Sequence, residues 1–182
     1  MEEHRPLVMR SNRFLGSALV ERNLIEVSDL ENANAKLLEI IKSGDLRQAS
    51  LLNILMFDMQ SLEEDALIER ILEESGIGLM ELSSYDLTRM EDPVWDLGSC
   101  WATQTVPFDS SEGFHFLATS YYLSDPARKY WQELLEGEII WFVAPMASIA
   151  ESLEALQLAI ESEEGLGEGE EAASEEAATE AG

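Results

Sequence analysis

Apolar residues follow helical spacing from residue 14 to residue 37, with one break. They are Leu15, Leu19, Leu24, Leu30, Ala33 and Leu37. The break falls at Asn23, a residue type that tolerates the left-handed backbone at the end of a helix. Ser28 with Glu31 three residues later is a capping-box pattern, which indicates a new helix. We therefore expect a short helix, a tight corner and a longer helix.

The same order of elements is expected a second time directly afterwards. A Ser-Gly pair ends the first long helix at Gly44, and an apolar-rich helix is expected over 46–58. Ser61 with Glu64 repeats the capping-box pattern, and a second Ser-Gly pair ends the helix that follows. Residues 13–76 are therefore predicted to form a helical bundle of two helix-pair repeats.

From residue 77 the pattern changes to the alternation typical of strands. The expected strands are 79–82, 103–108, 114–120 and 139–143. The middle two form a hairpin with a five-residue loop that contains Gly113. Asp92-Pro93 and Asp125-Pro126 are candidate helix starts, and 148–160 is expected to be a last amphipathic helix.

The fold class is therefore α+β, with an N-terminal helical bundle of two degenerate repeats over 13–76 and a small mixed α/β subdomain over 77–161. The polar residues 1–12 lack periodicity and are expected to be a flexible lead-in. The acidic segment 162–182 has no aromatic residue, so it cannot bury enough apolar area to offset chain entropy and is expected to be a disordered tail. Such a tail can keep the protein in solution, bind a partner or compete for a basic surface, and the sequence leaves these roles open.

The charge and the cysteine usage exclude several classes of protein. The 182 residues carry a formal net charge of -26. Residues 161–182 contain nine Glu, so 28 of the 37 acids remain against 11 basic residues and the body still carries -17. Such a chain repels nucleic acid and anionic lipid, and no apolar run approaches the roughly 18 residues of a membrane span. The N-terminus lacks a signal-peptide layout, and the single Cys100 excludes an internal disulfide framework, so a cytoplasmic protein is expected.

The helix–corner–helix segment resembles the N-terminal domain of GspE-type secretion and type IV pilus assembly ATPases, also called the MshEN domain. The family pattern is Arg-Leu-Gly, two variable residues, two aliphatics, two variable residues, Gly, Leu-Ile, a later Leu and a closing Gln. The matching residues are Leu15, Gly16, Leu19, Val20, Leu24, Ile25 and Leu30. Phe14 stands at the Arg position, Asn23 at the inner Gly and Leu37 at the closing Gln.

A second, weaker copy of the motif follows. Its Arg, Gly, inner Gly and closing Gln positions are Leu51, Asn53, Gln60 and Glu74. Only the apolar skeleton remains, in Leu52, Met56, Phe57, Leu62 and Leu67. The order of elements in the second half of the chain is also similar to the family, so the resemblance covers about residues 13–160.

The resemblance implies two functions. In the family's ATPases this domain engages the cytoplasmic part of an inner-membrane partner and couples it to the motor. The first reading is therefore a protein-docking or regulatory module of a type II secretion, type IV pilus or related envelope system. Its partner would be an inner-membrane component or an ATPase.

The second reading is a receptor for cyclic di-GMP or another nucleotide. In ligand-binding family members the Arg pairs with phosphate and guanine, the glycines admit the backbone close to the ligand, and the Gln contacts the base. The residues that would serve this function here are Arg13, Leu15, Gly16, Leu19, Leu24 and Ile25. Arg13 lies one residue early, a rotation of about 100° on a helix. Gly16 can also serve only to let two helices approach.

No enzyme is expected, and no catalytic residue is assigned. The sequence lacks the P-loop pattern Gly-x-x-x-x-Gly-Lys-Ser/Thr, so a free-standing domain without the ATPase motor is expected. His4 and His115 have no convergent ligands for a metal, and Cys100 has no histidine at motif spacing. No cofactor is expected, apart from the cyclic di-GMP of the second reading.

Aromatic residues are dense after residue 94, and most should be core. They include Trp95, Trp101, Tyr121, Tyr122, Tyr130, Trp131 and Trp141. Tyr121 and Tyr122 follow a strand, where one ring could be exposed as an anchor for a partner.

Overall fold

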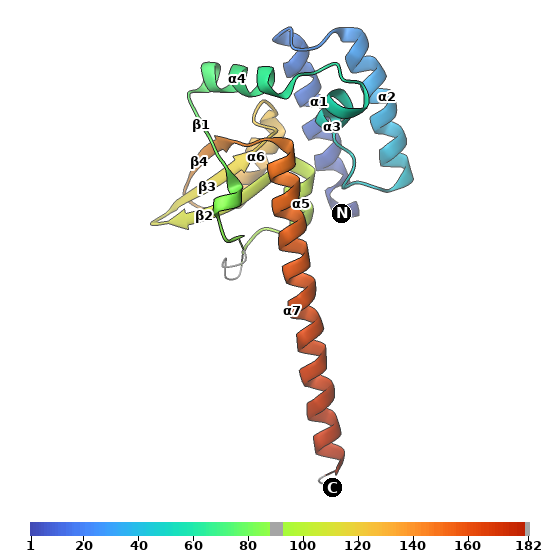
Figure 1. The fold of residues 1–182 in the computed structure, drawn as a ribbon, viewed down its shortest axis with the longest axis vertical. Coiled ribbons are helices and arrows are strands. Elements are labelled where there is room, and N and C mark those ends of the chain that lie inside the picture. The colour runs from blue at the N-terminus through green and yellow to red at the C-terminus, as the bar shows by residue number, and fades with distance from the viewer. Residues whose placement is uncertain (88–92, 181–182) are drawn as a thin grey trace.

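The computed structural model of this chain describes residues 1–87 and 93–180. The helices are η1 Glu2–His4, α1 Arg5–Glu21, α2 Val27–Ser43, α3 Leu51–Asn53, η2 Ile54–Asp58, α4 Glu64–Ser75, η3 Leu82–Ser84, α5 Leu97–Thr103, α6 Asp125–Leu134 and α7 Met146–Glu180. The strands are β1 Gly78–Leu79, β2 Thr105–Ser111, β3 Phe114–Thr119 and β4 Glu138–Val143. A helical part lies beside a small sheet with its own helices (Figure 1), which confirms the α+β fold class.

The two helix pairs repeat with a constant offset along the chain. Glu21 and Asp58 end the first helices, and Val27 and Glu64 begin the second, so both boundaries are 37 residues apart. The corner residues Asn23 and Gln60 are also 37 residues apart, and both have a left-handed backbone with φ of 54° and 52°. These are the inner-Gly positions of the motif, where a positive φ favours Gly. The backbone therefore confirms the duplication that the sequence preserved weakly.

The prediction that residues 1–12 form a flexible lead-in is wrong. Helix α1 begins at Arg5 and has a proline in its first turn, where the missing N–H costs nothing. Leu7 and Val8 are buried, and Asn12 is 1% exposed. The segment looked polar because it contains Ser11 and Asn12, which are buried. The Asn12 side chain donates two hydrogen bonds and the Ser11 carbonyl accepts one, and periodicity does not reveal such contacts.

The expected capping serines do not cap their helices. Glu26 is the N-cap of α2, and its backbone N–H donates to the Asp29 carboxylate at 3.3 Å. Glu63 precedes α4, and Ser61 instead donates its hydroxyl to the Leu55 carbonyl. An acidic residue can perform the same capping role as Ser at a helix start, and several acids are available here.

The helix expected over 46–58 begins later, at Leu51. Ser50 precedes it and accepts a hydrogen bond from the Asn53 N–H at 3.3 Å. The chain then continues as the π-helical turn η2. Leu46 and Ala49 are buried as expected, but in turns that precede the helix.

The four-stranded sheet has the order β1-β4-β3-β2 and is mixed, because β1 and β3 pair in parallel with β4 whereas β2 and β3 are antiparallel. The hairpin turn consists of Glu112 and Gly113, with φ of 51° and 85°, rather than a five-residue loop. Two consecutive positive φ angles are typical of a tight two-residue hairpin, so β2 continues to Ser111.

Three other elements differ from expectation. Strand β1 is shorter than 79–82, and the short helix α5 over Leu97–Thr103 was not expected. The helix start expected at Asp92-Pro93 depends on Asp92, which lies outside the described residues. The helix expected at Asp125-Pro126 is confirmed as α6.

Helix α7 continues through the acidic segment to Glu180 and projects away from the rest of the molecule (Figure 1). A single helix without tertiary packing is marginal in water. The disorder expected for 162–182 therefore stays a prediction for the protein in solution. Within the described part of the chain, no helix combines the length and the apolarity that crossing a bilayer requires.

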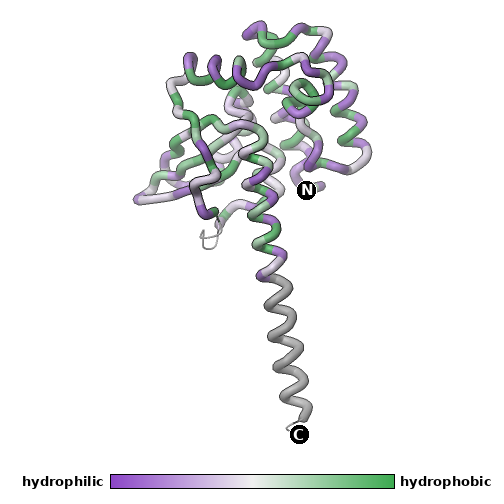
Figure 2. Tube along the Cα trace, in the orientation of Figure 1, coloured by the Kyte–Doolittle hydropathy of each residue, from purple (hydrophilic) through white to green (hydrophobic). Residues whose placement is uncertain are grey.

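The described residues form two hydrophobic cores, and the buried Leu and Val residues of α1 belong to the first. One core lies among the helices of the repeats and includes Leu15, Leu19 and Leu52. The other joins Leu117 of β3 to Trp131 of α6 and Ile149 of α7. Helix α1 contacts α2 in the helical part and α5 and α6 in the sheet part. Figure 2 shows the alternation of polar and apolar residues along the helices of the repeats.

Candidate functional site

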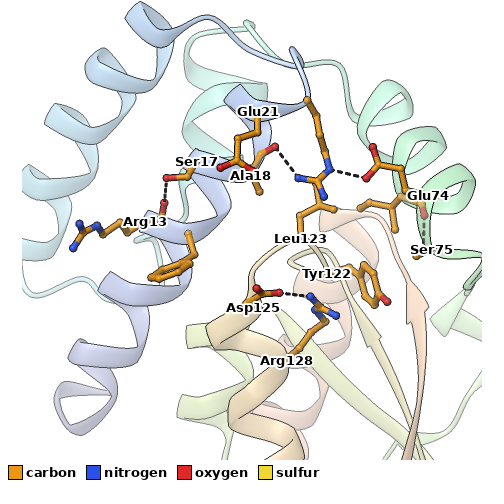
Figure 3. Close-up of a pocket in the computed structure, with 13 residues that line it drawn as sticks. Arg13, Ser17, Ala18, Glu21, Glu74, Ser75, Tyr122, Leu123, Asp125 and Arg128 are labelled. Atoms are coloured by element: carbon orange, nitrogen blue, oxygen red, sulfur yellow. Dashed lines mark hydrogen bonds and ion pairs between the residues drawn. The ribbon is translucent and has the colours of Figure 1, made fainter.

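A groove of about 780 Å³ lies between α1, the end of α4 and the start of α6 (Figure 3). It is called the α1–α4–α6 groove below. Its lining residues are Arg13, Phe14, Ser17, Ala18, Glu21, Arg22, Ile71, Glu74, Ser75, Tyr122, Leu123, Asp125 and Arg128. Both helix-pair repeats and the α/β part therefore contribute to one depression.

The α1–α4–α6 groove is electrically balanced, because three arginines face three acids. Arg22 Nε lies 2.7 Å from Glu74 Oε2, and Arg22 Nη1 donates to the Ala18 carbonyl at 3.1 Å. Arg128 pairs with Asp125, and its guanidinium carbon lies 4.6 Å from the centre of the Tyr122 ring. Two of the three cations are thus already engaged, and a dianionic ligand would have to displace carboxylates from them.

Two positions of the family motif meet in this groove. Phe14, at the Arg position of the first repeat, is 50% exposed there. Glu74, at the closing Gln position of the second repeat, also lines it. An aromatic ring offers no guanidinium fork to a phosphate, and the Glu74 carboxylate repels one. Neither residue therefore offers the group that the family motif has at its position.

A second groove, of about 540 Å³, lies between α1 and α2 and is called the α1–α2 groove below. It is lined by Pro6, Met9, Arg10, Arg13, Asn34, Leu37, Leu38 and Ile41. Met9 and Leu38 are both 46% exposed, so the apolar floor reaches solvent. Arg10 and Arg13 are exposed, and neither forms an ion pair within the described residues.

The six residues predicted as a ligand site do not form one surface. Leu15 and Leu19 are 0% exposed and Ile25 is 6% exposed. Leu24 is half-buried against the helical core. Arg13 alone of the six is exposed, and it borders both grooves.

Gly16 serves the close approach of two helices. A Cβ atom at this position would lie 2.6 Å from Leu30 Cδ1 and 3.0 Å from Leu51 Cδ2. Contacts this short cannot form without displacement of the neighbours. The packing therefore accounts for the glycine that the motif retains.

The aromatic residues mostly belong to the core, as expected. Trp131 is 0% exposed, Tyr121 is 1% exposed, and Tyr122 is half-buried at the α1–α4–α6 groove. Cys100 is buried, and desolvation raises the pKa of its thiol. A thiol in this state is a weak nucleophile at neutral pH.

A buried hydrogen-bond network was missed in the sequence. Tyr121 donates its hydroxyl to Asn12 Oδ1 at 2.6 Å, and the same oxygen accepts from the Leu51 N–H at 2.8 Å. Asn12 Nδ2 donates to the carbonyls of Val8 and Ala49. The network joins the helical part to the loop after β3, so it holds the two parts that frame the α1–α4–α6 groove.

Comparison with known proteins supports the fold. No family model matches the chain, and no curated protein matches it in sequence. The chain is similar to the N-terminal domain of XpsE in two crystal forms. One has a TM-score of 0.51 at 18% identity and covers 79% of this chain and 94% of that chain. The other has a TM-score of 0.50 at 18% identity and covers 76% and 90%. A structure of MshE with cdg has a TM-score of 0.47 at 17% identity and covers 78% and 97%.

The chain therefore has the fold of the XpsE N-terminal domain. This is the GspE-type N-terminal fold that the sequence resemblance implied. Both XpsE structures are of an N-terminal domain.

Proposed function

We propose that this chain is a non-catalytic docking module of a bacterial secretion, type IV pilus or related envelope system and acts in the cytoplasm through protein–protein contacts. The observation that carries the proposal is the α1–α2 groove, an apolar surface with two arginines that lack partners among the described residues. The family resemblance supplies the setting, because the family's N-terminal domain engages an inner-membrane partner.

The α1–α2 groove suits an amphipathic helix with acidic flanking residues. One wall of the groove is α1 from Pro6 to Arg13, and the other is α2 from Asn34 to Ile41. Eight helical residues span about 11 Å, which is roughly two turns of a bound helix. Its apolar face would cover Met9 and Leu38, as in other helix-in-groove complexes. Its carboxylates would pair with Arg10 and Arg13.

The test is affinity capture from a membrane extract of the source bacterium, read by quantitative mass spectrometry. The wild-type chain should enrich an inner-membrane secretion or pilus component. Leu38→Glu should reduce this enrichment at least about tenfold. It places a charge on the apolar floor, which costs more than roughly 1.4 kcal/mol of binding free energy. Val27→Glu is the matched control, because Val27 is also on α2, is 57% exposed and lies outside the groove.

Two results would contradict the proposal. One is capture that contains no secretion or pilus component. The other is equal enrichment by the wild type, Leu38→Glu and Val27→Glu, which would remove the α1–α2 groove from the interaction.

A nucleotide receptor is the second candidate, and the exposed Arg13 between the two grooves is the observation in its favour. The test is calorimetric titration with cyclic di-GMP at low salt. Stoichiometric binding that Arg13→Ala abolishes would establish this function. Absence of heat at high micromolar ligand, or an affinity unchanged in Arg13→Ala, would reject the site at Arg13.

A further inference from the structure

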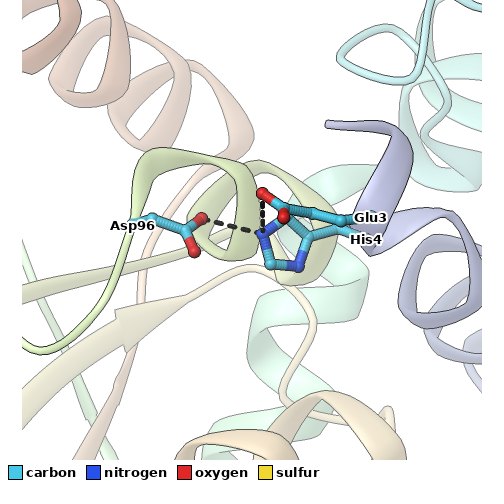
Figure 4. Close-up of side chains that lie close together, drawn as sticks. All are labelled: Glu3, His4 and Asp96. Carbon is cyan, nitrogen blue, oxygen red and sulfur yellow. Dashed lines mark ion pairs between the residues drawn. The ribbon is translucent and has the colours of Figure 1, made fainter.

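The side chains of Glu3, His4 and Asp96 converge where the N-terminus meets α5 (Figure 4). His4 Nε2 lies 2.9 Å from Asp96 Oδ1 and 3.6 Å from Glu3 Oε1. One ligand atom from each residue falls within 4.8 Å of the other two. The sequence did not indicate this cluster, because Asp96 is 92 residues away from His4.

His4 is the buried member of the cluster. Its side chain is 12% exposed, whereas those of Glu3 and Asp96 are 77% and 57% exposed. His4 Nε2 itself is buried and has no hydrogen-bond partner in the part of the chain that the structure describes, although the Asp96 oxygen is near. The oxygen therefore lies off the direction of the ring N–H, so a simple hydrogen bond does not satisfy this nitrogen.

The backbone leaves room for the imidazole at this point. A Cβ at Gly98 would lie 2.5 Å from His4 Cδ2 and 2.9 Å from His4 Nε2. Gly98 therefore allows the ring to pack closely against α5. Asp96 is held in place at the same time, because its Oδ1 accepts a hydrogen bond from the Ser99 N–H at 2.8 Å.

We infer that Glu3, His4 and Asp96 form a binding site for a divalent transition-metal ion of the Zn²⁺ type. Zinc binds histidine nitrogen and carboxylate oxygen at about 2.0–2.2 Å, so ligand atoms at angles of about 90–120° lie roughly 2.9–3.6 Å apart. The two distances from His4 Nε2 match this range. One imidazole and two carboxylates leave a coordination position open for water, and their charge suits a dication.

Such an ion would fasten the N-terminal helix to the α/β part, because Glu3 and His4 belong to η1 and Asp96 precedes α5. Binding only to the folded protein raises the free energy of unfolding by RT ln(1 + c/Kd), where c is the free ion concentration, so the stability grows with the logarithm of the ion concentration above Kd. The inference does not depend on the docking function, since neither groove contains any of the three residues.

The test uses the full chain without any affinity tag, titrated with Zn²⁺ by calorimetry and with Co²⁺ by visible absorption. We expect one site per chain, a Tm that rises with Zn²⁺, and a Co²⁺ spectrum that reports nitrogen and oxygen ligands. His4→Gln should remove the heat, the Tm rise and the Co²⁺ spectrum. Asp96→Asn should weaken binding at least about tenfold while it keeps the acceptor for the Ser99 N–H.

His115→Gln is the matched control, because it removes the other histidine of the chain, and it should bind like the wild type. Absence of Zn²⁺ binding at 100 times the protein concentration would overturn the inference. Binding that is equal in His4→Gln would overturn it too, since the ion would then lie elsewhere.

Discussion

At the scale of single residues, a buried hydrogen bond between Tyr121 and Asn12 joins the two parts of the molecule. The two residues are 109 positions apart, and both are buried. The Tyr121 hydroxyl also lies 2.8 Å from Ser50 Oγ. A buried network of this kind is stabilising when every member is satisfied and costly when one member is removed.

Tyr121→Phe is therefore expected to lower the free energy of unfolding by about 1–2 kcal/mol, since it removes a hydroxyl from buried partners. The measurement is urea unfolding followed by circular dichroism. Tyr122→Phe is the control, because Tyr122 is half-buried and its hydroxyl donates no hydrogen bond among the described residues. Equal effects of the two substitutions would show that the network contributes nothing specific.

The same tyrosine gives a pH dependence. Burial raises the pKa of Tyr121 above its ordinary value of 10.0. The unfolded chain therefore loses this proton before the folded chain does, and the free energy of unfolding falls as the pH rises above 10. Burial also raises the pKa of the Cys100 thiol above 9.0, so Cys100 likewise lowers the free energy of unfolding as the pH rises. Tyr121→Phe should flatten the pH dependence above pH 10, and an unchanged slope would contradict the assignment to Tyr121.

At the scale of elements, each of the two helix corners has a non-glycine residue with a left-handed backbone. Asn23 and Gln60 both have positive φ, but only Asn is a residue that accepts this conformation readily. The family motif has Gly at these positions. The chain therefore keeps the corner geometry through the packing of the helices on either side.

Gln60→Gly should raise the free energy of unfolding by up to about 1 kcal/mol, because it relieves a left-handed backbone that costs L-residues roughly 1–2 kcal/mol. Asn23→Gly should have a smaller effect. Asp58→Gly is the control, since it places Gly inside a helical turn and should destabilise the fold. If Gln60→Gly destabilised the protein as much as Asp58→Gly, strain at the corner would be excluded.

At the scale of the whole molecule, acidic charge lies both on the body, residues 1–160, and on the C-terminal end, residues 161–182. The last buried residue described in α7 is Leu156, whereas α7 continues to Glu180. Residues 161–182 add nine Glu to the charge of the chain.

Deletion of residues 161–182 is expected to leave the Tm within about 2 °C of the full chain, because ordinary packing contributions shift Tm only when buried contacts change. Removal of nine Glu also lowers self-repulsion, so any shift should be upward at low salt. Calorimetric scans at low and high salt measure this. A Tm loss of 5 °C or more would show that the end of α7 packs on the body. Limited proteolysis is a second measurement, and it should cut within 162–182 if that segment is disordered.

The sequence by itself determined the features that depend on neighbours along the chain. Gly44 and Gly76 end helices, Asn23 turns a corner, and Asp125 with Pro126 begins α6, as their local preferences require. The order of these signals was also enough to indicate the GspE-type N-terminal fold. Local backbone preference and periodicity act over a few residues, so they are readable without a structure.

Only the tertiary structure decided which distant residues share a surface. It places Phe14 and Glu74 in the lining of one groove, brings His4 beside Asp96, and buries Asn12 with Tyr121. These contacts arise because α1 packs against α2 and also against α5 and α6 of the α/β part. A polar residue is stable in the interior only when that packing supplies its partners. Neither hydrophobic spacing nor local turn chemistry contains this information, so the grooves and the Glu3–His4–Asp96 cluster could not be found from the sequence.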